Sequence, residues 1–399
     1  MDSTPVVIIG AGPAGLMLSH LLHLEGVESV VIEQQSREEV EKTVRAGILE
    51  QGTVKLMRRT GVGERLDREA EIDEGIEISI AGEAQRIDLH KYTSNIVAVY
   101  PQHEVLIDLI ARRLADNGEI WFNTTVESIE GHDTDSPSVT YVKQDGTKAT
   151  ISAQYVVGAD GSKSLARKII TGEGGQRLKH EYPYAWFGVM VNAPQTNREL
   201  IYATHPEGFA LISTRTPDVQ RYYVQCNPTD TVDMWPDERI WEELHKRVDS
   251  EKVTVSEGEI TDKAVLRFRS AVTDPMQSGR LFIAGDAAHT VPPTGAKGLN
   301  LAMSDISILA PALARAVKKS DVKLLEDYTS LALPRIWRAQ HFSYWMSSML
   351  HSVPTGDASN DRFQTERRLA ELKTVISTEA GRQLLAQQYV GYDLPEFEV

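Results

Sequence analysis

Three closely spaced glycines near the N-terminus constrain the fold more than any other feature of this chain. A continuous apolar run at residues 5–9 comes before them, and an apolar stretch at 16–24 follows. The first run is typical of a buried parallel strand and the second predicts a helix, so a further apolar run at 29–32 completes a strand–helix–strand pattern. The sequence therefore predicts a βαβ unit whose first turn holds Gly10, Gly12 and Gly15.

Each glycine has its own role in such a turn. Gly10 permits the tight turn, Gly12 lets a pyrophosphate approach the backbone, and Gly15 lets the helix pack closely on the strand. Glu33 follows the second strand, 23 residues after Gly10, where an acid binds the ribose hydroxyls of an adenosine. A tight turn without a ligand is the alternative, and the strand, helix and acid together favour a dinucleotide-binding unit.

Two later apolar runs also lead to an aspartate beside a glycine. Residues 155–159 lead to Asp160, and residues 281–285 lead to Asp286. Either pair alone is often no more than a turn. Three such turns after three buried strands indicate one long cofactor across the edge of a parallel sheet, and FAD has the required length.

The segment after Asp286 is a loop rich in proline and glycine, followed by a helix that we expect to begin near Leu299. Gly295 and Gly298 would let the backbone approach a flat ring closely. The start of the helix offers unpaired N–H groups and the positive end of its dipole to an anionic ring edge. Leu299 and Asn300 are therefore predicted to lie against the ring of the cofactor.

Length and composition set the class of protein. A chain of 399 residues is long enough for two or three domains, and no stretch approaches ~18 uninterrupted apolar residues, so no membrane span is expected. We expect a cytoplasmic protein, because no secretory signal is visible and the single Cys226 excludes an internal disulfide. With 42 basic and 57 acidic residues the net charge is −15, which argues against nucleic acid and anionic membranes as partners.

The rest of the chain changes character at two points. Aromatic residues and alternation dominate 181–269, which predicts an antiparallel domain, whereas the chain beyond Asp305 is predicted to be helical. We expect a mixed α/β fold, with this antiparallel substrate domain inserted into a Rossmann-like FAD-binding domain. The predicted divisions are 1–180 and 270–330 for the FAD-binding domain, 181–269 for the substrate domain, and 331–399 for a helical C-terminal region that forms core or a subunit interface.

Together, the glycine-rich turn and the two Asp-Gly turns resemble the three fingerprints of the class A flavoprotein aromatic hydroxylases. The resemblance implies the fold of that family, FAD as cofactor, NADH or NADPH as electron donor, and a homodimer. Further stretches resemble the members of the family that hydroxylate 4-hydroxybenzoate, so the implied reaction forms 3,4-dihydroxybenzoate with O2 through a flavin C4a-hydroperoxide. These stretches are 45–52, 199–203, 205–211, 221–225 and 291–301.

A hydroxybenzoate carries a carboxylate, which pairs best with a bidentate guanidinium. Arg215 could form this clamp with Ser213 on the same strand face and Tyr223 on a neighbouring strand. The resemblance assigns these three residues to the substrate carboxylate. Without it, a surface ion pair is an equal alternative for Arg215.

The phenol at the other end of the substrate must lose its proton before the ring is attacked. A tyrosine hydroxyl has a similar pKa, ~10, and can pass that proton on. The resemblance assigns Tyr202 to the phenol and Tyr389 to the next step, with a buried core tyrosine as the alternative for Tyr202. It also implies that the backbone carbonyl of Pro293 lies near the phenol oxygen and that Thr294 contacts the substrate.

Further roles are carried by the resemblance alone. A helix is predicted from Thr43, with Arg45 at its front edge, where an exposed solubilising arginine is the alternative. The resemblance gives cofactor contacts to Arg45 and Gln102. It gives the position of the flavin or contacts with NAD(P)H to Arg221, Gln34, Arg37, Lys42, Lys163 and Arg269.

Two positions depart from the family pattern. Three glutamates surround Arg37 and Lys42 and would repel a 2′-phosphate, which favours NADH or the use of both nucleotides. The proton chain of the family ends in a histidine where this chain has Asp73. A carboxylate of ordinary pKa is ionised at neutral pH, so we expect a different proton exit or one through water.

Three other functions fit these residues less well. The same chemistry on a 3-hydroxy- or amino-substituted benzoate fits less well, because Tyr202 and Tyr389 suit a para hydroxyl. A flavin-binding redox sensor without turnover would not need the clamp at Arg215. A dehydrogenase that uses NAD without flavin would leave both Asp-Gly turns without a role.

Overall fold

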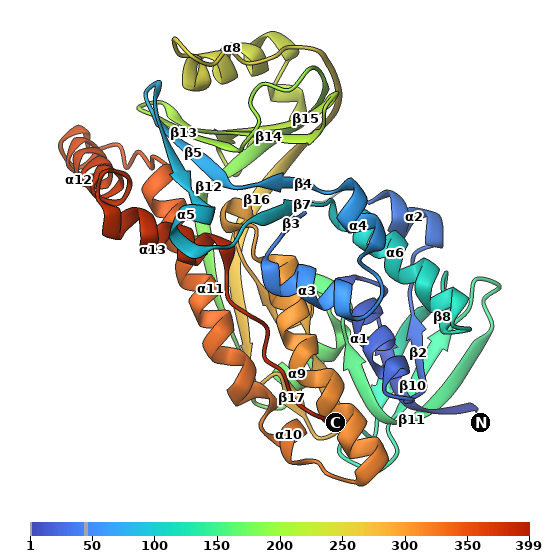
Figure 1. Ribbon diagram of the computed structural model, residues 1–399. Helices are drawn as coiled ribbons and strands as arrows, with labels where there is room; N and C mark the ends of the chain where they lie inside the picture. Colours follow the sequence, from blue (N-terminus) through green and yellow to red (C-terminus); the bar gives the residue numbers. More distant parts are fainter. Residues whose placement is uncertain (1, 44–46) are drawn as a thin grey trace.

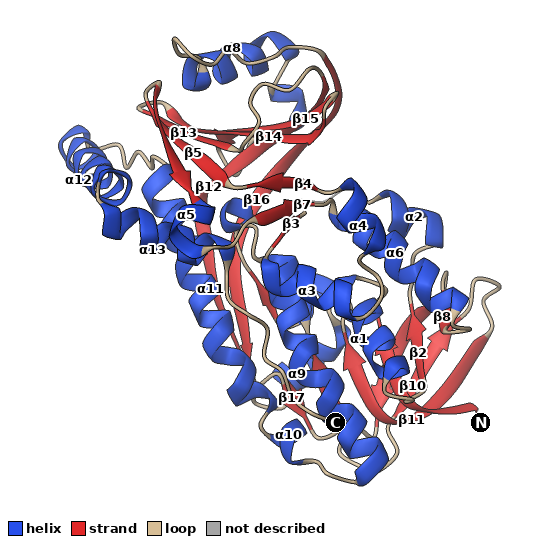
Figure 2. Cartoon of the chain, viewed as in Figure 1, coloured by secondary structure: helices blue, strands red, loops and turns tan. Residues whose placement is uncertain are grey.

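The computed structural model describes residues 2–43 and 47–399 of the chain. Two large sheets lie towards opposite ends of the molecule, and two long strands run between them (Figures 1 and 2). Helices cover the first sheet and pack on both faces of the second. No helix in the described ranges is long and apolar enough to cross a membrane.

The predicted βαβ unit is confirmed in the first sheet. Strand β1 (Asp2–Ile9) pairs in parallel with β2 (Ser29–Ile32), and α1 (Pro13–Leu24) connects them. On its other side β1 pairs in parallel with β11 (Lys148–Gly158), and β11 pairs with β18 (Leu281–Ile283). All three predicted turns therefore follow neighbouring parallel strands and meet at one edge of the sheet.

The second sheet is largely antiparallel, as predicted from residues 181–269. Its order is β19-β16-β12-β15-β14-β13-β5-β6, so two strands from residues 75–88 complete it, and β13 pairs with β5 in parallel. The hydrogen bonding of this sheet thus crosses the predicted domain divisions, which remain a prediction. Its strands are β5 (Gly75–Ile80), β6 (Glu83–Asp88), β12 (Gln176–Asn192), β13 (Ile201–His205), β14 (Gly208–Thr216), β15 (Val219–Cys226), β16 (Glu259–Asp274) and β19 (His289–Thr290).

Each face of the second sheet has its own core. One face packs under α8 (Asp237–Val248), a helix that the sequence analysis missed. The other face packs against the C-terminal helices, where aromatic side chains of the sheet meet those of α11 (Tyr328–Leu350). The predicted helical C-terminus is confirmed by α9 (Gly298–Lys319), α10 (Lys323–Glu326), α11, α12 (Ala358–Ser377) and α13 (Glu379–Val390).

One predicted helix boundary is wrong. The helix expected from Thr43 begins at Gln51, as α3 (Gln51–Arg59), because Ile48 and Leu49 form a short strand, β3, that pairs with β7 (Val97–Val99). Arg45 lies outside the described residues. The remaining elements are α2 (Arg37–Lys42), α4 (Glu64–Glu69), β4 (Glu71–Asp73), α5 (Leu89–Thr93), α6 (Gln102–Ala115), β8 (Glu119–Trp121), β9 (Thr125–Glu130), β10 (Ser138–Val142), α7 (Leu165–Gly172) and β17 (Gln277–Ser278).

Candidate active site

A cavity of about 550 Å³ follows the edge of the first sheet where its parallel strands end. It is lined by all three predicted turns, by the end of β2 and by the start of α9. The structure therefore brings together residues that lie up to about 290 positions apart in the chain. The predicted cofactor residues that line it are Gly10, Gly12, Glu33, Gln34, Gln102, Asp160, Lys163, Asp286 and Leu299.

The glycine-rich turn has the geometry that a pyrophosphate needs. A Cβ on Gly10, whose φ is +106°, would lie 2.4 Å from the carbonyl oxygen of Ala159, and a Cβ on Gly15 would lie 2.0 Å from that of Gly10. Nothing lies within 4 Å of a Cβ built on Gly12, so the backbone there is open to the cavity. Close packing on both sides of one open glycine is the arrangement that admits phosphate groups.

Two acids present oxygens to the same cavity. The carboxylate of Glu33 accepts the N–H groups of Ala11 at 2.7 Å and Gln35 at 2.8 Å, which fix its orientation. Asp160 accepts the Leu165 N–H through Oδ2, while its buried Oδ1 has no hydrogen-bond partner among the described residues. Burial raises the pKa of Asp160. A buried acceptor without a partner at a cavity wall suits a ligand hydroxyl, so these residues fit FAD.

Asn300, like Gly15, is a predicted cofactor residue that does not line the cavity. Its side-chain oxygen accepts the Glu50 N–H at 2.9 Å and the Thr53 hydroxyl at 2.8 Å, and its amide group donates to the carbonyl of Ile48 at 2.9 Å. These bonds hold the start of α9 against β3 and α3. Asn300 therefore supports the helix start, while Leu299 faces the cavity.

The predicted substrate residues share one face of the second sheet. Tyr202 pairs with Leu211, Leu211 with Tyr223, and Ser213 with Arg221, so these side chains and that of Arg215 point to the same side. Arg215 donates to the Ser213 hydroxyl at 2.8 Å, whereas its buried Nε has no partner in the described chain. Burial lowers the pKa of Arg215. A buried guanidinium without a carboxylate partner is suited to an anionic ligand.

At the other end of this face, the two predicted tyrosines are in contact. The hydroxyls of Tyr202 and Tyr389 lie 2.9 Å apart, and Tyr202 also donates to the carbonyl of Thr294 at 3.2 Å. Both tyrosines are buried, and burial raises their pKa values. The carbonyl of Pro293 accepts the Ala296 N–H at 2.9 Å inside the same turn, and its contact with the phenol oxygen stays a prediction.

The expectation of an ordinary pKa at Asp73 is wrong. Asp73 is buried at the end of β4, and burial, followed by the charges of Glu199 and Glu71, raises its pKa to about 7. Its charge also raises the pKa values of Tyr202 and Tyr389, which places it within electrostatic reach of both hydroxyls. A carboxyl with this pKa can accept a proton at neutral pH and hold it.

The residues predicted to contact NAD(P)H are dispersed. On α2, Arg37 pairs with Glu41 at 2.6 Å and Lys42 with Glu38 at 2.5 Å. Arg221 pairs with Asp262 at 3.1 Å, and its guanidinium lies over the Tyr223 ring. Arg269 lies in β16 opposite Glu181 in the strand register. Only Gln34 and Lys163 of this predicted set line the cavity.

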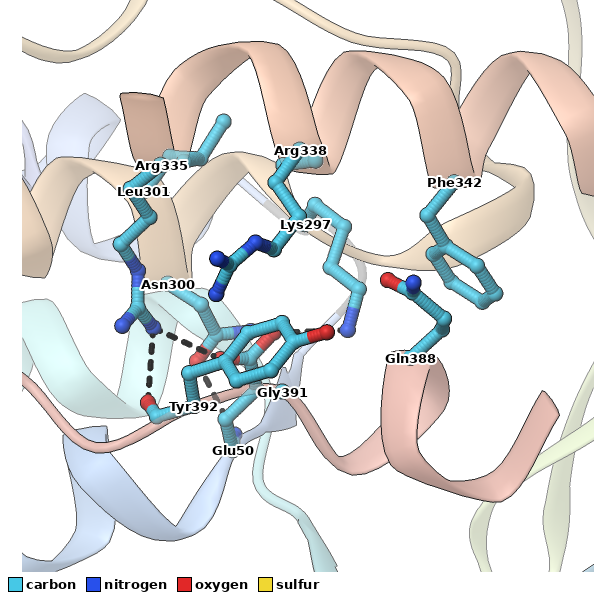
Figure 3. Close-up of a pocket in the computed structure, with 11 residues that line it drawn as sticks. Glu50, Lys297, Asn300, Leu301, Arg335, Arg338, Phe342, Gln388, Gly391 and Tyr392 are labelled. Atoms are coloured by element: carbon cyan, nitrogen blue, oxygen red, sulfur yellow. Dashed lines mark hydrogen bonds and ion pairs between the residues drawn. The ribbon is translucent and has the colours of Figure 1, made fainter. Parts of the chain in front are cut away.

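A buried ion cluster beside α9 was missed. Lys297 donates to Glu50 at 2.7 Å, and Arg335 donates to the other oxygen of Glu50 at 3.0 Å (Figure 3). Lys297 also donates to the carbonyl of Tyr389 at 2.7 Å. A Cβ on Gly391 would lie 1.9 Å from the Glu50 carboxylate. The cluster ties the end of α13, which carries Tyr389, to the start of α9. Its members come from four distant segments, so no local pattern marks it.

Comparison with known proteins places the chain in a family. The family described as an FAD binding domain matches residues 3–343. A p-hydroxybenzoate hydroxylase of Acinetobacter baylyi is 40% identical over 97% of this chain and 95% of its own. Aklavinone 12-hydroxylase RdmE of Streptomyces purpurascens is 28% identical, over 81% of this chain and 64% of its own.

Solved structures agree on the fold. The p-nitrophenol 4-monooxygenase PnpA of Pseudomonas putida DLL-E4 superimposes with a TM-score of 0.79 at 20% identity, over 99% of this chain and all of its own. Aklavinone-11 hydroxylase, solved with FAD and aklavinone, gives 0.74 at 24% identity over 88% of this chain and 70% of its own. This chain belongs to the FAD-dependent aromatic hydroxylases, flavoprotein monooxygenases that take their electrons from NADH or NADPH.

Proposed function

We propose that this protein converts 4-hydroxybenzoate to 3,4-dihydroxybenzoate with O2, FAD and NADH or NADPH. The observation that carries the proposal is the arrangement on one sheet face. The Arg215 guanidinium, whose buried Nε has no partner among the described residues, lies at one end, and the Tyr202–Tyr389 hydroxyl pair lies at the other. These groups match a carboxylate and a para hydroxyl at opposite ends of one ring. The name of the Acinetobacter relative supports the same substrate.

The residues of this chain bind the substrate and move its proton. Bound FAD supplies the electron transfer and the activation of oxygen. Arg215 and Ser213 hold the carboxylate, and Tyr202 accepts the proton of the phenol, which makes the ring electron-rich. Tyr389 passes the proton on, and the ionised form of Asp73 receives it. The raised pKa of Asp73 supports this last role, because the carboxylate then binds a proton firmly near neutral pH.

The start of α9 stabilises negative charge on the bound cofactor. Leu299 and its neighbours present backbone N–H groups to the cavity, at the positive end of the helix dipole. Lys297 adds a buried cation directly before this helix, although Glu50 offsets part of its charge. The burial of Tyr202, Tyr389 and Thr294 keeps water from that end of the site, which limits the loss of activated oxygen as hydrogen peroxide.

We further propose that NADH is preferred, or that both nucleotides are used. Both cations of α2 are already paired with glutamates of the same helix, so neither is free for a 2′-phosphate. A homodimer is proposed as well, since Trp337 and Tyr344 on α11 are large apolar side chains about half exposed. The proposed location is the cytoplasm, where the buried thiol of Cys226 would remain reduced.

The test is the initial rate of NADH and NADPH oxidation by the FAD-loaded protein, with and without 4-hydroxybenzoate, with the aromatic product identified. Strong stimulation with formation of 3,4-dihydroxybenzoate is the expected result. Stimulation that yields only hydrogen peroxide would show that the clamp binds this ring while the true substrate is another benzoate. No stimulation by this or related benzoates would refute the hydroxylase and favour a flavin-binding sensor.

A further inference from the structure

Helix α11 carries a line of buried polar side chains on the face that meets the loop 290–295. The line consists of Gln340, Ser343 and Ser347, whose spacings of three and four residues place them on one face of the helix, and of His351, the C-cap residue that follows α11. Their exposed fractions are 6%, 0%, 0% and 2%. We call these four residues the polar stripe of α11. Buried polar groups need hydrogen-bond partners, so the polar atoms of the stripe must bond to other protein groups or to ordered water.

Part of the stripe is bonded to the loop that carries the predicted substrate contacts. Gln340 donates to the carbonyl of Thr290 at 2.8 Å, and Ser347 donates to the hydroxyl of Thr294 at 2.7 Å. Between these two contacts, a Cβ on Gly295 would lie 3.1 Å from the Ser343 hydroxyl. The loop is therefore held by the stripe near both of its ends and packs directly on the middle.

Three polar atoms at this junction have no hydrogen-bond partner within the described chain. They are the hydroxyl of Ser343, the side-chain oxygen of Gln340 and the hydroxyl of Thr290. Gln340 is in direct contact with Thr290 and lies one helical turn from Ser343. A buried water typically makes about three hydrogen bonds, and these two hydroxyls and one amide oxygen offer both donors and acceptors.

We propose that an ordered water molecule binds Ser343, Gln340 and Thr290, and that this water and Ser347 together fix the loop 290–295 for hydroxylation. The fixed element is the Thr294 carbonyl, which accepts the Tyr202 hydroxyl at 3.2 Å. The effect of this water and of Ser347 on hydroxylation rests on the proposed function. Ser343 and Ser347 touch no reacting atom, so they are positioning residues that act through Thr294.

The consequence for the reaction follows from that carbonyl. At 3.2 Å the bond from Tyr202 is already long, so a small shift of the loop would break it. Tyr202 would then turn its hydroxyl away from the phenol, and proton removal would no longer keep pace with oxygen activation. Misplacement by about 1 Å at a reacting centre can cost on the order of 100-fold in rate. Oxygen activated without an electron-rich ring would be lost as hydrogen peroxide.

The first experiment is crystallographic and needs no substrate. The FAD-loaded wild-type protein should show one ordered water bonded to the three groups, and Ser343→Ala should lose or displace it. Ser348→Ala is the matched control, because Ser348 lies on the same helix and its hydroxyl bonds, among the described residues, only to the carbonyl of Trp345. Electron density without a water among the three groups in the wild-type protein would overturn the proposal.

The second experiment measures coupling, the fraction of oxidised NADH or NADPH that yields hydroxylated product. Ser347→Ala should lower this fraction by about 10-fold while the substrate KM stays within about 2-fold, and Ser347→Thr should restore it because the hydroxyl is retained. Ser348→Ala should couple like the wild type. Flavin content and melting temperature, compared with the control, identify variants that fail to fold.

Unchanged coupling in well-folded Ser347→Ala would refute the positioning role. A wild-type protein that forms no 3,4-dihydroxybenzoate would refute the proposed function instead. In that case the crystallographic result alone decides whether the water binds.

Discussion

The hydroxyls of Tyr202 and Tyr389 lie 2.9 Å apart, although the residues are separated by 187 positions in the chain. One belongs to the second sheet and the other to the last helix. The contact exists because the aromatic face of the sheet packs against the C-terminal helices. A proton path built across such a packing interface depends on both layers, and the first prediction addresses it.

Replacing Tyr202 by phenylalanine should leave substrate binding largely intact and remove the first proton acceptor. General base catalysis is worth about 10²–10⁴-fold, so the rate of hydroxylation should fall by at least ~100-fold. Stimulated oxidation of NADH should continue and yield hydrogen peroxide. Product per nucleotide oxidised is the measurement, with Tyr392→Phe as control, since Tyr392 is partly exposed on the chain beyond α13. Equal coupling in Tyr202→Phe and the wild type would contradict the proton path.

Replacing Arg215 by glutamine should have opposite effects on binding and on stability. Loss of a buried charge partner typically costs about 2–5 kcal/mol, so the dissociation constant of 4-hydroxybenzoate should rise by at least ~30-fold. The protein without substrate should become more stable by about 1–3 kcal/mol, because a buried cation without a carboxylate partner is removed. Equilibrium binding and thermal unfolding measure the two effects, with Arg362→Gln on α12 as control. A destabilised variant would show that Arg215 has a structural partner.

Hydroxylation should gain a pH dependence from Asp73. The ionised form accepts the proton and its pKa is about 7, so the rate of the proton-removal step should rise as pH increases through that value. Asp73→Asn should abolish the rise. Glu71→Gln should move its midpoint to lower pH, because the charge of Glu71 contributes to the raised pKa. Single-turnover rates across pH test this, and an unchanged profile in Asp73→Asn would place the proton acceptor elsewhere.

The raised pKa of Asp73 also predicts how the stability of the folded protein depends on pH. This pKa is higher in the folded protein than in the unfolded chain, so the folded state binds the proton more tightly between pH 4 and pH 7. Stability is therefore lost as pH rises through this window, by up to about 4 kcal/mol. Asp73→Asn should match the wild type near pH 4 and exceed it above pH 7 in denaturant unfolding. A variant that is less stable than the wild type at pH 8 would show that the ionised carboxylate has a stabilising partner.

Nucleotide preference should respond to the glutamates of α2. The double variant Glu38→Gln/Glu41→Gln frees Lys42 and Arg37 from their ion pairs. Exposed pairs contribute little, so kcat/KM for NADPH relative to NADH should rise only about 2–5-fold. The effect should fade at high salt, where surface charges are screened. Glu366→Gln/Glu379→Gln, on the exposed surface of α12 and α13, controls for the loss of two charges. A ratio that stays constant in the α2 variant would exclude α2 from recognition of the 2′-phosphate.

The parts of the fold that were predicted correctly have local causes. The turn at Gly10–Gly15 and the helices beyond Asp305 follow from apolar periods and glycine positions within single segments. The helix predicted from Thr43 was wrong because Ile48 pairs with Val99 in a strand, and no local pattern identifies Val99 as its partner. The pairing of β13 with β5 could not be predicted from a local pattern either, since β5 lies about 120 residues earlier in the chain.

The site residues that could be predicted also have local causes, and those that could not depend on distant segments of the chain. Glu33 and Asp160 were found because each follows a strand, and strand ends converge in a parallel sheet. Lys297 was missed because its partners lie in α13 and at Glu50. The pKa of Asp73 was misjudged because it depends on burial, which only the folded structure reveals.

The parallel pairing of β13 with β5 limits how this protein can be altered. Residues 181–269 cannot be exchanged as a module, because a transplanted segment would leave the β13 edge without its neighbour and would expose unpaired backbone groups. A new ring specificity must therefore arise by substitutions on the existing sheet face. An exchange of the whole substrate sheet would have to carry residues 75–88 with it, although these residues stand far from 181–269 in the chain.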